Sequence, residues 1–171
     1  KFFILSIPDL ITLKIIDQKR LNINNCWSFS IRNTWLENEN LWIPPNVQLN
    51  LGNPLNEVGL RKEFCKNDLF VIPSRRDTFP LSLLEAMDTG ILFISSDRVG
   101  LTERFPESFN KFVVPFGNAE KLKDKILELH NLDYSKKNKL ADEIKNFASG
   151  FSWDKITNNY VRLYNELLKH V

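Results

Sequence analysis

Short apolar segments alternate with amphipathic segments along this chain. Six segments rich in aromatic and β-branched residues are apolar without a break, which is typical of strands that are covered on both faces. They are FFILSI (2–7), CWSFSI (26–31), NVQLNL (46–51), DLFVIP (68–73), ILFISS (91–96) and KFVVP (111–115). Helical periodicity is clearest at 55–66, 80–89 and 118–131. This alternation predicts an α/β fold with a Rossmann-like parallel sheet of about six strands and helices on both faces.

Two further helices are predicted after the last strand, at 136–149 and 152–169. The second carries a stripe of apolar residues at steps of three and four, namely Ile156, Tyr160, Leu163, Tyr164 and Leu167. Such a stripe is expected to lie on an apolar partner surface. Trp153, which begins this helix, is expected to pack in the interior.

Composition narrows the classes of protein to consider. A chain of 171 residues with a net charge of +2 predicts one domain over 1–171 and does not favour nucleic-acid binding. The longest apolar runs have four or five residues, which is too short for a membrane span. Two cysteines without a CxxC motif and two histidines predict reduced thiols and no metal site. Because the chain begins with Lys1, we expect it to be a piece of a longer protein.

The stretch DTFPLSLLEAM (77–87) follows the predicted strand 68–73 and enters the most apolar helix. In an open α/β sheet, ligands bind beyond the carboxyl ends of the strands. Pro80 suits the first turn of a helix, which leaves the backbone amides of Leu81 and Ser82 free to face an anion. This loop is therefore a predicted phosphate site.

Two acids in this stretch are candidate ligand-binding groups. Glu85 is expected on a mostly covered, leucine-rich face, where an ionised carboxylate is costly unless hydrogen-bond donors reach it. The two hydroxyls of a ribose would supply such donors. Asp77 lies in the loop before the helix, where it could accept hydroxyls of a sugar beyond the phosphates. Two alternatives stay open: Asp77 could cap the helix, and Glu85 could pair with a lysine or arginine.

Three phrases of the sequence resemble one enzyme family. They are DLFVIPSRRDTFPLSLLEAMDTGILFISSDRVGLTE (68–103), VPFGNAEKL (114–122) and FSWDKITNNYVRLY (151–164). Together they resemble the C-terminal domain of GT-B glycosyltransferases of family four, the glycosyl transferases group 1 set, over about residues 46 to 168. The resemblance implies a domain that binds a nucleotide sugar, with an N-terminal acceptor domain absent from this chain.

The resemblance assigns roles to individual residues. In the family's Glu-x7-Glu signature, Asp77 takes the place of the first glutamate, which binds the transferred sugar, and Glu85 matches the second, which binds ribose. Phe79, Pro80 and Leu81 match the family's loop beside the sugar and diphosphate, and Gly100 matches one glycine of its Gly-Gly pair. The full set of predicted donor-binding residues is Ser74, Arg75, Arg76, Phe79, Pro80, Leu81, Ser82 and Gly100.

Four positions depart from the family pattern. Asp77 is one methylene shorter than glutamate, Pro80 replaces a commoner glycine, and Gly100 stands alone where the family has two glycines. The segment PDLITLK (8–14) also lacks the family's basic pair for the diphosphate. Arg75 and Arg76 are alternative phosphate partners, although an exposed arginine pair is usually just solvated.

The expected activity is retaining transfer of a hexose-type sugar from a nucleotide diphosphate sugar, with a UDP-sugar favoured. The acceptor would be a glycan or glycolipid held by the missing N-terminal domain, so the isolated chain should turn over little. No D-x-D motif is present, and neither a metal nor a cofactor is expected. We expect a cytoplasmic location, with attachment to the membrane surface through the missing half left open.

Two rival functions remain. A non-catalytic Rossmann-like interaction module would use the same fold without binding a donor. A dinucleotide-dependent oxidoreductase domain would also have alternating strands and helices, but the sequence has no G-x-G-x-x-G after any predicted strand.

Overall fold

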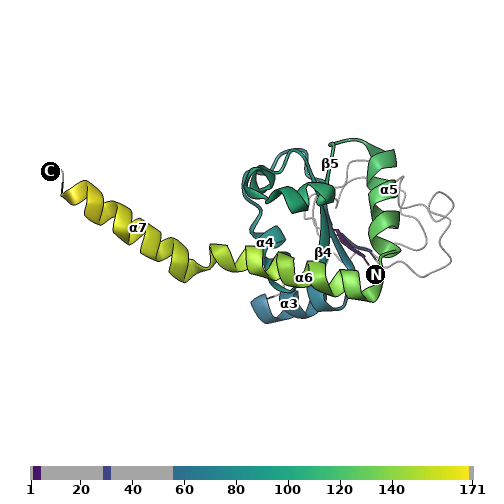
Figure 1. Cartoon of the computed structure of the whole chain (residues 1–171), viewed down its shortest axis with the longest axis horizontal. Helices are drawn as coiled ribbons and strands as arrows, with labels where there is room; N and C mark the ends of the chain where they lie inside the picture. Colours follow the sequence, from purple (N-terminus) through teal and green to yellow (C-terminus); the bar gives the residue numbers. More distant parts are fainter. Residues whose placement is uncertain (1, 5–28, 32–55, 170–171) are drawn as a thin grey trace, which may run out of the picture.

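A computed structural model describes residues 2–4, 29–31 and 56–169 of this chain (Figure 1). Their strands form one parallel sheet in the order β2-β1-β3-β4-β5. The strands are β1 (Phe2–Ile4), β2 (Phe29–Ile31), β3 (Leu69–Ile72), β4 (Leu92–Ser96) and β5 (Val113–Val114). Each falls inside an apolar segment of the sequence, which confirms the prediction of a parallel α/β fold.

The number of strands differs from the prediction. The described sheet has five strands, whereas about six were expected. The remaining predicted strand, 46–51, lies outside the described residues.

The strand order identifies where this sheet changes direction. β1 pairs with β2 on one side and with β3 on the other, so strands that follow one another in the chain lie on both sides of β1. In open α/β sheets, the crevice beyond the carboxyl ends of the strands at such a switch point is the usual ligand site. The loop that follows β3 therefore lies at the expected position for a ligand.

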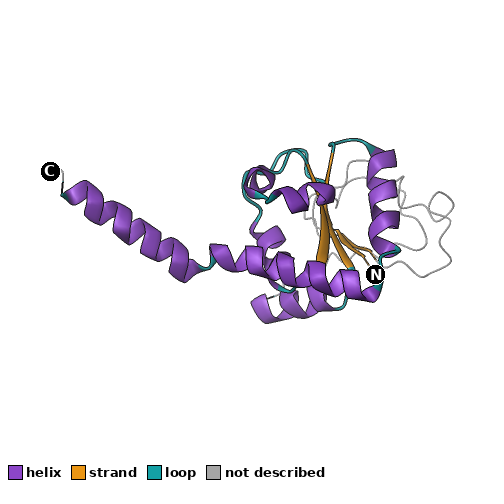
Figure 2. Ribbon diagram, viewed as in Figure 1, coloured by secondary structure: helices purple, strands orange, loops and turns teal. Residues whose placement is uncertain are grey.

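Helices flank both faces of the sheet. In Figures 1 and 2, α4 and α5 lie on opposite sides of the strands. The helices are α3 (Glu57–Cys65), α4 (Leu81–Asp88), α5 (Ala119–His130), α6 (Tyr134–Ala148) and α7 (Trp153–Leu168). Three short 3₁₀ helices complete the described part: η2 (Gly100–Arg104), η3 (Glu107–Phe112) and η4 (Ser149–Phe151).

Side-chain caps explain where most of these helices begin. Each of four N-cap side chains, those of Asn56, Asn118, Asp133 and Ser152, accepts a hydrogen bond from the backbone amide three residues later. Such bonds satisfy amides that a helix leaves unpaired in its first turn. The N-cap of α4 is Pro80, which has no side-chain acceptor. Among the described α-helices, α4 alone begins without a side-chain cap.

The core lies between the sheet and its helices and is rich in phenylalanine. Every residue of β3 and β4 is buried, which agrees with an unbroken apolar pattern covered on both faces. The largest fully buried side chains are Phe64, Phe70, Ile72, Leu83, Met87, Phe93, Phe109 and Phe112. The sheet is thus a rigid support for the loops at its carboxyl edge.

The last helix differs from its prediction. α7 projects away from the sheet (Figure 1), and most of its apolar stripe is exposed: Ile156 is half-buried, whereas Tyr160, Leu163, Tyr164 and Leu167 are exposed. Trp153 is 77% exposed, so the expectation that it packs in the interior is wrong for this structure. The apolar periodicity correctly predicts the helix but not its burial.

Candidate functional site

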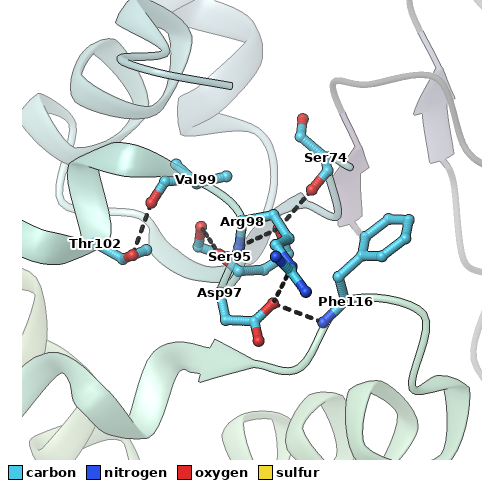
Figure 3. Close-up of polar contacts among 8 residues, drawn as sticks. Ser74, Ser95, Asp97, Arg98, Val99, Thr102 and Phe116 are labelled. Carbon is cyan, nitrogen blue, oxygen red and sulfur yellow. Dashed lines mark hydrogen bonds and ion pairs between the residues drawn. The ribbon is translucent and has the colours of Figure 1, made fainter. Parts of the chain in front are cut away.

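The loop after β3 is fastened to the loop after β4 by a buried serine. The Ser96 hydroxyl donates to the Ser74 carbonyl oxygen at 2.6 Å and accepts from the Arg98 amide at 3.3 Å. Figure 3 labels Ser74 and Arg98, the two residues that this hydroxyl joins. Both serines are buried, at 1% and 8% exposure for Ser96 and Ser74. Because a hydrogen bond in such surroundings is costly to break, the two loops are held together where they leave the sheet.

The backbone of Asp77 is held on both sides. Its amide donates to the Arg98 carbonyl oxygen at 3.3 Å, and its carbonyl oxygen accepts from the Gly100 amide at 2.8 Å. These bonds form an isolated parallel bridge between Asp77 and Val99. These bonds fix the backbone from which the half-buried Asp77 side chain projects.

The carboxylate of Asp77 has no hydrogen-bond or ion-pair partner in the part of the chain that the structure describes. The alternative in which Asp77 caps the next helix is wrong, because α4 has Pro80 as its N-cap and no side-chain capping bond. The Asp77 carboxylate is thus a hydrogen-bond acceptor at the carboxyl end of β3 that no described residue uses.

Gly100 allows η2 to approach this loop closely. A Cβ atom at Gly100 would lie 2.4 Å from the Thr78 carbonyl oxygen and 3.2 Å from its carbonyl carbon. Both atoms belong to the backbone, so no side chain can move aside to make room. The single glycine that the sequence retains at this position is required by packing against the Asp77 loop.

We expect Gly100→Ala to displace the Asp77 loop and to lower the free energy of unfolding by about 1–3 kcal/mol, the usual cost of overpacking. Urea denaturation of parent and variant measures this loss. Gly150→Ala is the matched control, since a Cβ there meets no atom within 4 Å. Equal unfolding midpoints for parent and Gly100→Ala would contradict the proposed close approach.

The first turn of α4 faces the same loop. Pro80 is buried and is the N-cap of α4, so the helix begins at Leu81, one residue later than predicted. The Pro80 carbonyl oxygen accepts from the Leu83 amide at 3.1 Å. The amides of Leu81 and Ser82 make no hydrogen bond to any described residue. The first turn also lacks an acidic side chain. The positive end of this helix is therefore uncompensated by the described residues, as an anion site requires.

Glu85 is exposed, which corrects the expectation of a mostly covered carboxylate. The leucines around it do bury part of the helix, but the side chain of Glu85 faces outward from the core. No ion pair or hydrogen bond joins its carboxylate to another described residue, so the alternative pairing with a lysine or arginine is not observed there. The Glu85 carboxylate is therefore free to accept hydrogen bonds from a ligand, but it does not need them to offset burial.

A cavity of about 550 Å³ lies beside Glu85, between α3, α4 and the start of α7. Its lining is largely apolar and includes Leu60, Phe79, Leu81, Glu85, Trp153 and Tyr160. Pockets of 300–1,000 Å³ that combine apolar walls with a few polar groups are typical of small-molecule sites. The volume and lining are compatible with a nucleoside next to Glu85.

One ion pair joins α3 to α4 at the cavity. The Arg61 guanidinium on α3 donates a hydrogen bond to the Asp88 carboxylate on α4, and this bond raises the pKa of Arg61 above its usual value. Both residues line the cavity. Since Arg61 is engaged by Asp88, it does not neutralise the nearby Glu85.

The predicted site residues fall into separate groups. Phe79, Leu81 and Glu85 share the lining of the cavity, whereas Arg75 and Arg76 do not. These arginines are exposed at the carboxyl end of β3 and make no ion pair with a described residue. Three other predicted residues belong to neither group. Ser74 is buried, Asp77 forms a backbone bridge with Val99, and Gly100 packs against the backbone of Thr78.

Sequence reasoning missed the residues that brace the loop. Ser96 and the backbone of Arg98 hold Ser74 and Asp77, and Phe151 contacts Phe79 with ring centroids 5.8 Å apart. A hydroxyl residue at the carboxyl end of a neighbouring strand, as in FISSD (93–97), was the available signal for Ser96. No local signal indicates the contact of Phe151, because its partner is 72 positions away in the sequence.

The described residues hold no group of three or more His, Cys, Asp or Glu side chains that could bind a metal ion. None of the described helices has the length and apolar character needed to cross a membrane.

Related proteins of known or assigned type match this chain. An uncharacterized glycosyltransferase of Methanocaldococcus jannaschii is 32% identical over 102 residues, covering 60% of this chain and 29% of the relative. The N,N'-diacetylbacillosaminyl-diphospho-undecaprenol alpha-1,3-N-acetylgalactosaminyltransferase of Campylobacter jejuni is 31% identical over 104 residues, covering 61% of this chain and 27% of that enzyme. The chain spans less than a third of the length of these curated relatives.

The fold also matches a solved structure. Sucrose-phosphate synthase from Thermosynechococcus elongatus superposes with a TM-score of 0.73 at 16% identity, over 99% of this chain and 46% of that enzyme. At this identity the likeness concerns the fold, which is that of one part of a GT-B glycosyltransferase.

The family model described as "Glycosyl transferases group 1" matches residues 37–148, which is well over half of the chain. This range contains the Asp77 loop, the unpaired start of α4 and Glu85. The chain belongs to the glycosyl transferases group 1 family.

Proposed function

We propose that this chain is the nucleotide-sugar-binding domain of a retaining glycosyltransferase, with Asp77 and Glu85 as its two recognition carboxylates. The observation that carries the proposal is that no described residue pairs with either carboxylate and that the two lie on either side of the same helix start. Both lack a partner among the described residues, and they flank the uncapped first turn of α4 at the carboxyl end of β3. Acceptors on either side of a free helix N-terminus match a ligand with hydroxyls on either side of a diphosphate.

Each residue has a role in this arrangement. Glu85 accepts the two ribose hydroxyls beside the cavity, and the amides of Leu81 and Ser82 contact the diphosphate. Arg75 and Arg76 supply positive charge from the preceding loop. Asp77 accepts hydroxyls of the transferred sugar, and the fixed backbone around it sets the orientation of that sugar.

Catalysis in this proposal depends on the leaving group. Negative charge grows on the departing diphosphate as the glycosidic bond breaks, so donors fixed around it stabilise the transition state more than the ground state. The amides of α4 are suited to this role because they are preorganised by the helix. No metal ion is assigned a role in this step.

The donor is proposed to be a UDP-sugar of the hexose type, and the acceptor a glycan or glycolipid. The Campylobacter relative is named as a transferase of N-acetylgalactosamine to a sugar-diphospho-undecaprenol, which supports this class of acceptor. The acceptor would be held by an N-terminal domain beyond this chain, so we expect the chain alone to transfer little sugar. The reaction would take place in the cytoplasm, at or near a membrane surface.

A nucleotide panel tests the proposal directly on this chain. We expect millimolar UDP to raise the melting temperature, GDP and ADP to raise it less, and NAD to leave it unchanged, because a ligand stabilises the state that binds it. No shift with any of the nucleoside diphosphates would favour the non-catalytic interaction module. A shift with NAD alone would favour an oxidoreductase domain.

A further inference from the structure

A row of phenylalanine rings connects the core of the sheet with the proposed donor loop. Phe93 of β4 contacts Phe105 at 5.4 Å, and Phe105 contacts Phe147 of α6 at 5.5 Å between ring centroids. Phe147 contacts Phe151 at 5.1 Å, and Phe151 contacts Phe79 at 5.8 Å. The first ring is fully buried and the last is 44% exposed, so the row runs outward to the loop.

Phe79 occupies a short span between two anchored points. On one side the backbone of Asp77 is bonded to Arg98 and Gly100, and on the other side Pro80 is buried as the N-cap of α4. Thr78, the other residue in this span, is exposed. Within the described residues, the ring contact of Phe79 is with Phe151. Phe151 is therefore the side-chain support of the span between the sugar-binding acid and the phosphate-binding amides.

The position of Phe151 is itself well determined. It lies in η4, between the end of α6 and the start of α7. The Lys155 ammonium donates to the Ser149 carbonyl oxygen at 2.9 Å, which closes the turn around Phe151. The contact with Phe147 attaches the same ring to α6. The turn between the last two helices thus sets where the Phe151 ring lies.

We propose that Phe151 is a positioning residue of the donor site, which acts through Phe79 to hold the span between Asp77 and the first amides of α4. This inference rests on the proposed function. Phe151 and Phe79 also line the cavity beside Glu85, but through Phe79 the Phe151 ring supports the span that follows Asp77, whereas Glu85 comes from the next turn of α4. Loss of the ring should therefore weaken recognition of the sugar more than recognition of the nucleotide.

The test measures dissociation constants by calorimetry for two ligands of each variant. UDP-glucose, GDP-mannose and ADP-glucose are first compared on the parent chain. The sugar nucleotide that binds most tightly is then measured on every variant, together with the nucleoside diphosphate that it contains. For Phe151→Ala we expect about a tenfold weaker affinity for the sugar nucleotide and at most about a threefold weaker affinity for the diphosphate, because the ring also lines the cavity. Phe151→Tyr keeps the ring and should restore the parent values.

Controls separate this role from a loss of folding. Phe151→Leu keeps most of the apolar volume and should also weaken the sugar nucleotide selectively, because the loss is then of ring contact rather than of core packing. Tyr134→Ala removes an exposed ring at the start of α6 that does not line the cavity, and it should bind both ligands like the parent.

The possible outcomes are distinct. Equal weakening of both ligands in Phe151→Ala and Phe151→Leu, or no change in either, would overturn the positioning role while leaving the proposed function intact. Failure of the parent chain to bind any probe or its diphosphate would overturn the proposed function and this inference with it.

Discussion

Asp77→Asn is expected to lower sugar transfer about a hundredfold in a full-length glycosyltransferase that contains this chain, while nucleoside diphosphate affinity stays within about twofold. Asparagine has nearly the same shape, and the bonds of residue 77 to Arg98 and Gly100 involve only its backbone. The loop should therefore keep its position. What is lost is a charged acceptor, and hydrogen bonds to charged groups contribute about 1.5–3 kcal/mol, which corresponds to roughly 10- to 150-fold.

Steady-state kinetics with saturating acceptor, combined with calorimetry of the diphosphate, separates these two effects. Glu107→Gln is a suitable control, because Glu107 is an exposed acid of η3 that has no ion pair among the described residues. Asp77→Glu adds the methylene by which this chain differs from the family pattern. Its transfer rate, compared with that of the parent, shows whether the site accepts the longer side chain. Transfer by Asp77→Asn at the parent rate would remove Asp77 from the site.

Glu85→Gln is expected to weaken binding of UDP about tenfold or more. The proposed contacts are charge-assisted hydrogen bonds from the ribose hydroxyls, and replacing one carboxylate oxygen by an amide group removes an acceptor and the charge. The exposed position of Glu85 in α4 makes a loss of stability small. Calorimetry on the chain alone measures the change.

The deoxy ligand makes this prediction specific. The parent should bind 2′-deoxy-UDP more weakly than UDP, and Glu85→Gln should no longer distinguish the two, because the lost hydroxyl and the lost carboxylate belong to the same contact. Glu57→Gln is the matched control, since Glu57 lines the same cavity and has no ion pair among the described residues. If Glu85→Gln kept the full preference for UDP over the deoxy ligand, ribose recognition by Glu85 would be wrong.

The elements of the fold follow closely from the apolar pattern. Segments 68–73 and 91–96 contain β3 and β4, whose residues are all buried, and the predicted helix at 118–131 contains α5. This agreement has a simple cause, because a strand covered on both faces needs apolar residues at every position and an amphipathic helix needs them on one side. The site acids also came from the sequence, through their spacing before and within one helix and through the family resemblance.

The same pattern failed where burial depends on distant parts of the chain. Glu85 was expected to be covered because leucines precede it, yet it is exposed beside a cavity. Trp153 and the stripe on α7 were expected to pack, yet Trp153 and all of the stripe except Ile156 are exposed. Periodicity reveals which side of a helix is apolar, but what covers that side is decided by elements elsewhere in the fold.

By itself, the sequence determined a parallel α/β domain of the glycosyl transferases group 1 family and the two candidate acids. Only the tertiary structure decided how the acids are presented. The backbone of Asp77 is hydrogen-bonded to Arg98 and Gly100. Ser96 joins the loops after β3 and β4, and the Phe79 ring packs against Phe151. The physical reason is that every residue has a backbone carbonyl and every residue except proline has a backbone N–H, so their pairing leaves little trace in the sequence. It arises only when parallel strands bring their carboxyl ends, and the loops that follow them, to one edge of the sheet.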